Sequence, residues 1–243
     1  ATGQARHVLC FRALTESSSQ TATRRASIPG AGRARLGGWY SYLVPANAMS
    51  ASNWAGWMAM RYFHEFGMTR EHLGLIATGQ RAFAQHNPSA VMPSPLTMDD
   101  YLGARMISSP LGLFDCDVPI DGACVVIVSA ADAARDCAKP PLAIETMGSA
   151  LGSQETWDQR ADLTTMGAHD SAAHMWSRTD LKPGDVDVLG LYDGFSIFVP
   201  LWLEAMGFCG HGEAKDFIAE GNIGPGGRFP VNTGGGQLSA GRL

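Results

Sequence analysis

Short apolar runs alternate with helix-like stretches through the second half of the chain. The apolar runs are bounded by turn-forming residues, as is typical of buried strands, and cover residues 122–128, 142–147 and 186–191. The helix-like stretches cover residues 130–137, 167–178 and 196–206. Because strands that alternate with helices form layered domains, this pattern predicts a layered α/β fold.

The first half of the chain predicts one strand followed by a helical region. Residues 7–14 are a β-rich apolar run, whereas residues 15–38 are rich in Ser, Thr, Arg and Gly and are expected to form a loop. Large apolar residues recur every three or four positions across residues 53–66, which indicates a helix. Thr69 and Thr97 are expected to be the N-caps of two more helices, the first of which runs to about residue 85.

The chain is expected to contain parts of two domain halves. Their boundary falls near residues 139–141, where two prolines follow a lysine. Residues 1–138 are then the end of an N-terminal half, with a helical insertion at about residues 39–110, and residues 139–243 form a C-terminal half. The chain opens without a start signal for a helix or strand and stops just after a glycine-rich loop, so we expect it to be incomplete at both ends.

Composition excludes several classes of protein. The 243 residues carry a net charge of −5 with scattered basic residues, which argues against nucleic-acid binding. No uncharged apolar run is long enough to span a bilayer. The five cysteines are odd in number and form no C-x-x-C pair, so neither a disulfide framework nor a zinc site is indicated. Reduced thiols favour a cytoplasmic location.

The segment Tyr192-Asp193-Gly194-Phe195 follows an expected strand and precedes an expected helix. Functional residues collect in loops at strand ends, and a glycine there lets the backbone approach a ligand. Tyr192 can exchange a proton, but its pKa, ordinarily about 10, must be lowered for it to act as a base near neutral pH. The alternative is a buried tyrosine beside an aspartate that caps the helix.

Three consecutive glycines, Gly234, Gly235 and Gly236, lie between Asn232-Thr233 and Gln237. The backbone N–H groups of such a loop can face an anion or a thioester oxygen. Glycine-rich segments are also common linkers, so the loop alone leaves both interpretations open.

The cysteines and histidines give no catalytic signal. Cys116 lies between Asp115 and Asp117, whose negative charges raise the pKa of a thiol, so we interpret it as structural. Cys10 and Cys124 lie in apolar strand-like runs and are expected to be small core residues. Two histidines on one expected helix are five residues apart, which is not the spacing of a zinc-binding helix. We interpret His64, His169 and His174 as surface or structural residues, whereas His86 and His211 lie in expected loops and give no decision.

Three segments, taken in order, resemble the thiolase superfamily over essentially the whole chain. DCDVPIDGACVVIVSAADAA is similar to the segment that ends the first thiolase half. YDGF falls where thiolases carry an Asn-Glu-Ala-Phe or His-Asp-Cys-Phe type of motif, and NTGGGQLSAGRL falls where they carry Asn-x-x-Gly-Gly followed by Gly-His-Pro. The resemblance implies a thiolase-like αβαβα fold with two related halves.

The departures from the thiolase pattern concern the catalytic residues. Arg242 stands where thiolases have the histidine of Gly-His-Pro, and Tyr192 replaces the Asn or His of the other motif. An arginine is always protonated and cannot be the base that activates a thiol, so thiolysis is not expected. The two loops more closely resemble the lipid-transfer-protein aldolases of bacterial steroid side-chain degradation, which are thiolase-like proteins.

This closer resemblance implies retro-aldol cleavage of a steroid β-hydroxyacyl-CoA to a ring ketone and propionyl-CoA, with no cofactor, because the CoA thioester is the substrate. It also implies a homodimer that binds the OB-fold (DUF35) domain of an acyl-CoA hydratase. We expect Tyr192 to take the β-hydroxyl proton and Asp193 to orient the loop or relay a proton, while glycine N–H groups hold the enolate oxygen. The expected substrate-binding residues are Asn232, Gly234, Gly235, Gly236 and Arg242.

Two other functions stay open at this point. A degradative thiolase would use CoA to cleave a β-ketoacyl-CoA through a reactive cysteine, and a non-catalytic thiolase-like subunit would bind acyl-CoA and leave it intact. The helical insertion is rich in aromatic residues and methionine. Core packing with a dimer contact is the favoured interpretation of these residues, and a pocket for a bulky apolar ring system is the alternative.

Overall fold

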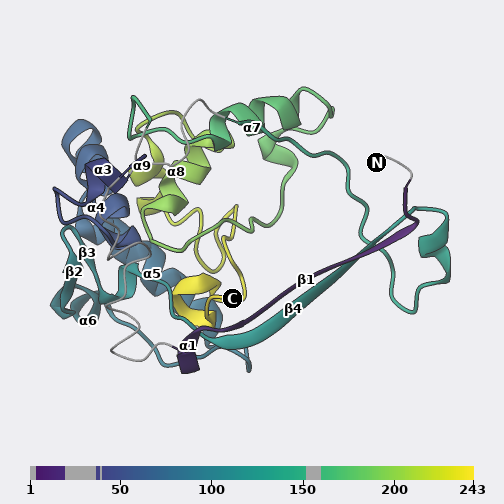
Figure 1. The fold of residues 1–243 in the computed structure, drawn as a ribbon, viewed down its shortest axis with the longest axis horizontal. Coiled ribbons are helices and arrows are strands. Elements are labelled where there is room, and N and C mark those ends of the chain that lie inside the picture. Colours follow the sequence, from purple (N-terminus) through teal and green to yellow (C-terminus); the bar gives the residue numbers. More distant parts are fainter. Residues whose placement is uncertain (1–3, 20–36, 39, 152–159) are drawn as a thin grey trace.

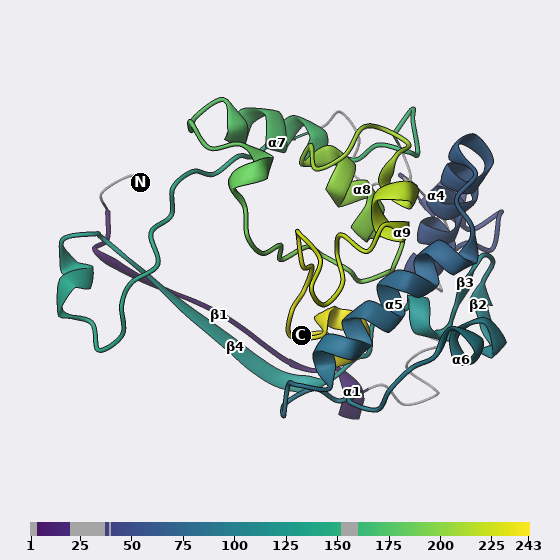
Figure 2. The same cartoon turned by 180° about the vertical axis from the view of Figure 1, so that it is seen from behind.

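The structure is a computed structural model that describes residues 4–19, 37–38, 40–151 and 160–243. A body of helices and loops carries a long two-stranded arm that projects from one side (Figures 1 and 2). The loop expected over residues 15–38 lies mostly outside the described residues, and its first part forms the short helix α1 (Glu16–Ser19). Among the described residues, every helix is too short or too polar to span a bilayer.

The arm is an antiparallel pair of strands, β1 (His7–Thr15) and β4 (Asp121–Ser129). Both strands are confirmed, and their register runs from His7 opposite Ser129 to Thr15 opposite Asp121. Their apolar side chains are largely exposed, and these are Val8, Leu9, Phe11, Val125, Val126, Ile127 and Val128. The expectation that Cys10 and Cys124 are core residues is wrong, because both are exposed on this arm.

The three helices expected in the first half are confirmed as α4 (Ala51–Phe66), α5 (Arg70–Ala84) and α6 (Met98–Gly103). Thr97 caps α6, since its hydroxyl oxygen accepts a hydrogen bond of 3.1 Å from the Asp100 N–H. Helix α5 packs against α6 and against the turn η5 (Gly236–Ala240) near the end of the chain. It therefore links the helical insertion to the glycine-rich loop (Figure 2).

Two further helices confirm expectations in the second half: α7 (Ala168–Trp176) and α8 (Phe198–Ala205). Helix α9 (Ala214–Ala219) follows and packs on α8 and α5. One hydrophobic core joins these helices to α4 and α5, and its fully buried large side chains include Tyr62, Leu73, Ile76, Ile197, Leu201 and Leu203.

Several short elements complete the described chain. They are α3 (Tyr40–Leu43), β2 (Met106–Ser108) paired antiparallel with β3 (Leu111–Gly112), the 3-10 turns η1 (Leu113–Asp115), η2 (Ala133–Asp136) and η4 (Pro183–Asp185), and the π-helical turn η5 (Gly236–Ala240).

Three expected elements of the second half are wrong. Residues 130–137 form only the 3-10 turn η2, and residues 142–147 have no regular structure. Residues 186–191 contribute a single isolated bridge, Leu189 with Val231. A strand is stabilised by hydrogen bonds to its neighbours. Residues 142–147 instead lie along α7 through side-chain contacts, such as the 3.1 Å hydrogen bond from the Thr146 hydroxyl to the Met175 carbonyl.

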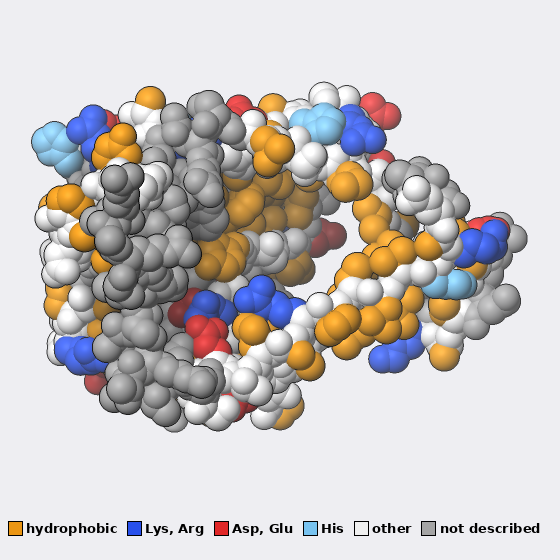
Figure 3. Space-filling view, viewed as in Figure 1, with side chains coloured by type: hydrophobic (Ala, Val, Ile, Leu, Met, Phe, Trp, Pro, Cys, Tyr) orange, Lys and Arg blue, Asp and Glu red, His pale blue; other side chains and the backbone are white. Residues whose placement is uncertain are grey.

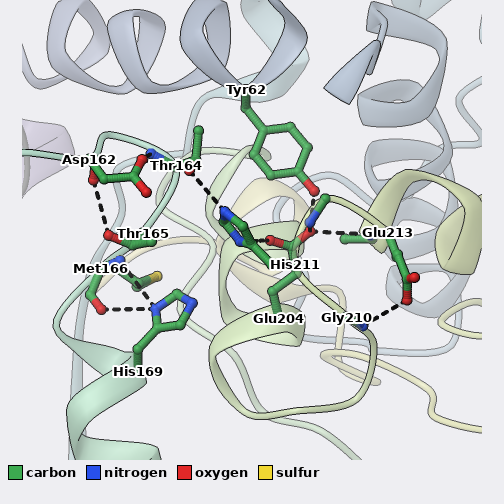
Figure 4. A network of polar contacts seen from close by, with 12 residues as sticks. Tyr62, Asp162, Thr164, Thr165, Met166, His169, Glu204, Gly210, His211 and Glu213 are labelled. Carbon is green, nitrogen blue, oxygen red and sulfur yellow. Dashed lines mark hydrogen bonds and ion pairs between the residues drawn. The ribbon is translucent and has the colours of Figure 1, made fainter. Parts of the chain in front are cut away.

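A buried carboxylate ties α4, α8 and the loop before α9 together (Figure 4). Glu204 of α8 accepts hydrogen bonds from the Tyr62 hydroxyl of α4 and from the Gly212 and Ala214 N–H groups at 3.0 and 3.2 Å. His211 Nδ1 lies 3.1 Å from the same carboxylate. Because burying a carboxylate is costly unless its oxygens are hydrogen-bonded, these contacts fix how α8 sits on α4.

The polar network continues beyond His211 (Figure 4). Its Nε2 lies 3.2 Å from the Thr164 hydroxyl, which donates to Asp162 at 2.6 Å. His169 Nδ1 lies 3.0 Å from the Met166 carbonyl oxygen. The structural interpretation of His169 is therefore confirmed, and His211, for which the sequence gives no decision, belongs to the same network.

Replacing Tyr62 with phenylalanine is expected to lower the free energy of unfolding by about 1.5–3 kcal/mol, the usual worth of a hydrogen bond to a charged group. The ring volume is kept, but Glu204 loses a buried donor. Urea unfolding of the intact protein measures the change. Tyr42→Phe is the matched control, because Tyr42 is 71% exposed and the same change there should be neutral. Equal effects of the two variants would show that the Glu204 network does not fix the packing.

Candidate active site

The two motif loops meet around the carboxylate of Asp193. This side chain is 1% exposed, and its two oxygens accept hydrogen bonds of 3.0 and 2.9 Å from the Gln237 N–H. Asn232 makes a second connection, because its amide group pairs with the Leu191 N–H and carbonyl at 2.9 Å each. The YDGF loop and the glycine-rich loop are thus one unit, as expected if both belong to one site.

The glycines of the second loop are required by this close approach. Gly235 and Gly236 have φ angles of +106° and +59°, which L side chains rarely adopt. A Cβ atom on Gly236 would lie 2.1 Å from an oxygen of Asp193, and one on Gly235 would lie 2.7 Å from Ala84 of α5. The Gly235 N–H already donates to the Asn232 carbonyl at 2.8 Å, so it is not one of the groups that could hold an enolate oxygen.

A third segment joins the two loops, and it is the one that begins DCDVPIDG and ends the first half in the thiolase resemblance. The Asp117 N–H donates to the Gly194 carbonyl at 3.1 Å, and the Val118 N–H donates to the Gln237 carbonyl at 3.0 Å. The backbone of Arg242 is bonded to the same segment, because its N–H donates to the Val118 carbonyl at 2.7 Å. Asp117 therefore lies between the YDGF loop and the end of the glycine-rich loop.

Arg242 is held by two carboxylates where the arm meets the body. Its Nε lies 2.8 Å from Asp117 Oδ2, and one terminal nitrogen is paired with Glu16 of α1. All three side chains are partly exposed, at 26% for Arg242, 16% for Asp117 and 25% for Glu16. The space-filling view shows basic and acidic side chains at the foot of the arm (Figure 3). The guanidinium that was expected to bind substrate is thus fixed in place by ion pairs.

Tyr192 lies beside this charge cluster. Its ring stacks on Phe198 with 5.7 Å between ring centroids, and the side chain is 40% exposed. Burial and the nearby carboxylates of Asp117 and Asp193 raise its pKa above the ordinary value, while Arg242 opposes them. The expectation that the surroundings lower this pKa is not met by the described residues, which hold the phenol in its protonated form.

The two aspartates of the cluster differ in their roles. Burial raises the pKa of Asp193, and the N–H groups of Gln237 and Leu238 work against this by binding the charged form. Burial also raises the pKa of Asp117, to about 6, with the negative charges of Glu16 and Asp193 adding to the effect and Arg242 opposing it. Asp193 is a structural carboxylate, whereas Asp117 changes its charge at a pH of about 6.

Cys116 does not contribute a nucleophile to this site. Burial, followed by the charges of Asp115 and Asp117, raises the pKa of its thiol to about 12. The thiol lies 3.5 Å from the Gly112 carbonyl oxygen. The interpretation of Cys116 as structural is consistent with this, since the thiol stays protonated at neutral pH.

Comparison with known proteins supports the thiolase-like fold that the motifs predict. Residues 149–242 match the family described as thiolase C-terminal domain-like. The chain is 38% identical to a steroid side-chain-cleaving aldolase of Thermomonospora curvata, with 98% of the chain and 62% of that relative covered. It is 35% identical to a 17-hydroxy-3-oxo-4-pregnene-20-carboxyl-CoA lyase of Mycobacterium tuberculosis, with 98% of the chain and 63% of that relative covered.

Among solved structures, the chain resembles an Ltp2-ChsH2(DUF35) aldolase with a TM-score of 0.83 and 34% identity, over 97% of this chain and 60% of that one. The predicted thiolase resemblance and the thiolase-like α/β fold class are thereby confirmed. The chain spans about three fifths of the length of the relatives it matches. The proposed division at residue 138 is tested by none of these matches and stays a prediction.

Gly236→Ala is expected to destabilise the intact protein by roughly 1–3 kcal/mol, because alanine is strained at a positive φ and its Cβ would push Asp193 off the Gln237 amide. Urea unfolding measures the effect. Gly184→Ala is the control, since a Cβ there meets nothing within 4 Å and its φ is not positive. A Gly236 variant as stable as the control would refute the close packing of the two loops.

Proposed function

We propose that this chain, whose residues 149–242 belong to the thiolase C-terminal domain-like family, carries the reaction centre of a carbon–carbon lyase. The substrate is a steroid β-hydroxyacyl-CoA, and the products are a ring ketone and propionyl-CoA. No cofactor takes part, because the CoA thioester itself stabilises the carbanion as an enolate. The names of the two curated relatives, an aldolase and a pregnene carboxyl-CoA lyase, support this choice of substrate and reaction.

One observation carries the proposal: the two motif loops bring Tyr192 and Arg242 into one charge cluster. A thiolase needs a base at the position of Arg242 to activate a thiol, and an ion-paired arginine cannot supply one. Retro-aldol cleavage needs no thiol. It needs a group that handles the β-hydroxyl proton and positive or N–H groups near the enolate, and both kinds of group are present here.

The geometry supports a specific version of the chemistry. Because Tyr192 is protonated at rest, it acts by accepting the substrate proton while giving up its own, rather than as a preformed phenolate. Gly234 and Gly236 are the glycines whose N–H groups we assign to the enolate oxygen, since that of Gly235 is already bonded to Asn232. Asn232 and Asp193 hold the loops in register.

An apolar surface near the site suits a steroid. The space-filling view is hollowed between the body and the arm, and hydrophobic side chains gather on both sides of the hollow (Figure 3). The arm also carries the exposed apolar side chains of Phe11, Val125 and Ile127. We assign part of this surface to the ring system, because steroid-sized apolar ligands are bound mostly by apolar and aromatic side chains.

The partners belong to the same proposal. We assign to the protein a homodimer and an OB-fold (DUF35) partner domain from an acyl-CoA hydratase. The Ltp2-ChsH2(DUF35) aldolase, whose structure the chain resembles, supports the second assignment. A cytoplasmic location is supported by the five cysteines, none of which is in a disulfide.

The test uses the intact protein with its DUF35 partner and a steroid β-hydroxyacyl-CoA, with no free CoA added. We expect release of a ring ketone and propionyl-CoA, and a loss of roughly 10²–10⁴-fold in kcat for Tyr192→Phe, the usual contribution of a proton-transfer group. Products are identified by mass spectrometry. Tyr42→Phe, which removes an exposed hydroxyl, should cleave at the wild-type rate.

Three outcomes contradict the proposal in different ways. Turnover of a β-ketoacyl-CoA that requires added CoA would identify a degradative thiolase. Binding of acyl-CoA without any turnover would identify a non-catalytic subunit. Near-wild-type cleavage by Tyr192→Phe would leave the lyase reaction standing and remove Tyr192 from its centre.

A further inference from the structure

Asp117 is an acidic residue of the site for which the sequence motifs predict no role. It lies directly beside both motif loops, because its own N–H and the next one donate to Gly194 and Gln237. Its Oδ2 is 2.8 Å from Arg242 Nε, and its side chain is 16% exposed. The carboxylate is therefore fixed in position and still reachable from the site.

We propose that Asp117 is a positioning residue of the reaction: held by Arg242, it accepts through Tyr192 the proton that leaves the substrate β-hydroxyl group. This inference rests on the retro-aldol function proposed above and assigns the destination of its first proton. Tyr192 and Asp117 interact electrostatically, and the Asp117 N–H donates to the carbonyl of Gly194, two residues after Tyr192 in the YDGF loop.

The electrostatics of the cluster explain why an acceptor is needed. A Tyr192 phenolate would lie beside two carboxylates, Asp117 and Asp193, and this disfavours loss of its proton to solvent. Passing the proton to Asp117 removes one of these negative charges at the same moment. Asp193 is a poor acceptor in comparison, because it is buried and its oxygens bind backbone N–H groups.

The step balances without any added reactant. The β-hydroxyl proton moves to the Tyr192 oxygen as the Tyr192 proton moves to Asp117. The bond between the α- and β-carbons breaks, the β-carbon becomes the ketone, and the electron pair forms the enolate of the thioester. Return of the proton from Asp117 through Tyr192 or solvent to the α-carbon gives propionyl-CoA. One negative charge thus moves from Asp117 to the enolate, while the charge of Arg242 stays in the cluster.

The groups that face Asp117 give the inference a directional test. Burial raises the pKa of Asp117, Arg242 lowers it, and Glu16 and Asp193 raise it further, to a net value of about 6. Since the charged form is the acceptor, kcat/KM should fall as the pH drops through about 6. Arg242→Gln should move this acid limb to higher pH, and Glu16→Gln should move it to lower pH.

The experiment is a pH profile of kcat/KM for the intact protein with its DUF35 partner, with the steroid β-hydroxyacyl-CoA as substrate. Asp117→Asn should lose the acid limb and fall by roughly 10²–10⁴-fold above pH 7. Asp99→Asn, an exposed carboxylate on α6, is the matched control and should keep both the limb and the rate. Circular dichroism of each variant establishes that the fold is retained.

The outcomes separate this inference from the proposed function. If the wild-type protein cleaves the substrate but Asp117→Asn keeps the acid limb, the role of Asp117 is wrong and the lyase function stands. The same conclusion follows if the limb does not move in Arg242→Gln and Glu16→Gln, because a purely structural ion pair would change the rate without shifting the limb. If the wild-type protein does not cleave the substrate, both proposals fail.

Discussion

The hydrogen bonds between the Asp193 carboxylate and the Gln237 N–H set the geometry on which the rest of the site depends. A carboxylate that is almost completely buried is tolerated only when its oxygens are bonded, and here the donor comes from a loop more than 40 residues further along the chain. The neighbouring glycines follow from this contact, because a Cβ on Gly236 would occupy the space of the Asp193 oxygen. Gly235 and Gly236 are therefore required first for packing, and only the remaining N–H groups of the loop are candidates for binding an anion.

The helices of the body hold the two loops that make the contact between Asp193 and Gln237. Helix α5 carries Ala84 and Gln80 against the glycine-rich loop, and its opposite end is packed on α6. Helix α8 begins directly after the YDGF loop and is fixed to α4 through Glu204. One end of each of these two helices therefore lies at a motif loop. Packed helices at these positions hold reactive groups in place, so little reorganisation is needed during the reaction.

Most of the helices and several of the candidate site residues could be predicted from the sequence, for reasons that differ from element to element. Helices α4 to α8 carry their own signals, such as the Thr97 cap and the apolar spacing of residues 53–66, so they could be placed in advance. The strands expected at residues 142–147 and 186–191 are absent, because a strand depends on a neighbouring strand that its own sequence does not encode. Tyr192, Asp193 and the glycines were found through their motifs. Asp117 was missed because it was considered only as a neighbour of Cys116, and its partner Arg242 lies 125 positions away in the sequence.

If Arg242 occupies the position of the thiolase histidine, as the motif resemblance implies, the site handles charge differently from a thiolase. A histidine can move a proton and so can create a thiolate, whereas Arg242 keeps its proton and can only offset negative charge. That constant positive charge is paired with Asp117 at rest. When Asp117 becomes neutral, the same guanidinium is left to balance negative charge elsewhere in the cluster. In a retro-aldol cleavage that charge develops on the enolate at the moment the carbon–carbon bond breaks, so an arginine at this position suits a lyase better than a thiolase.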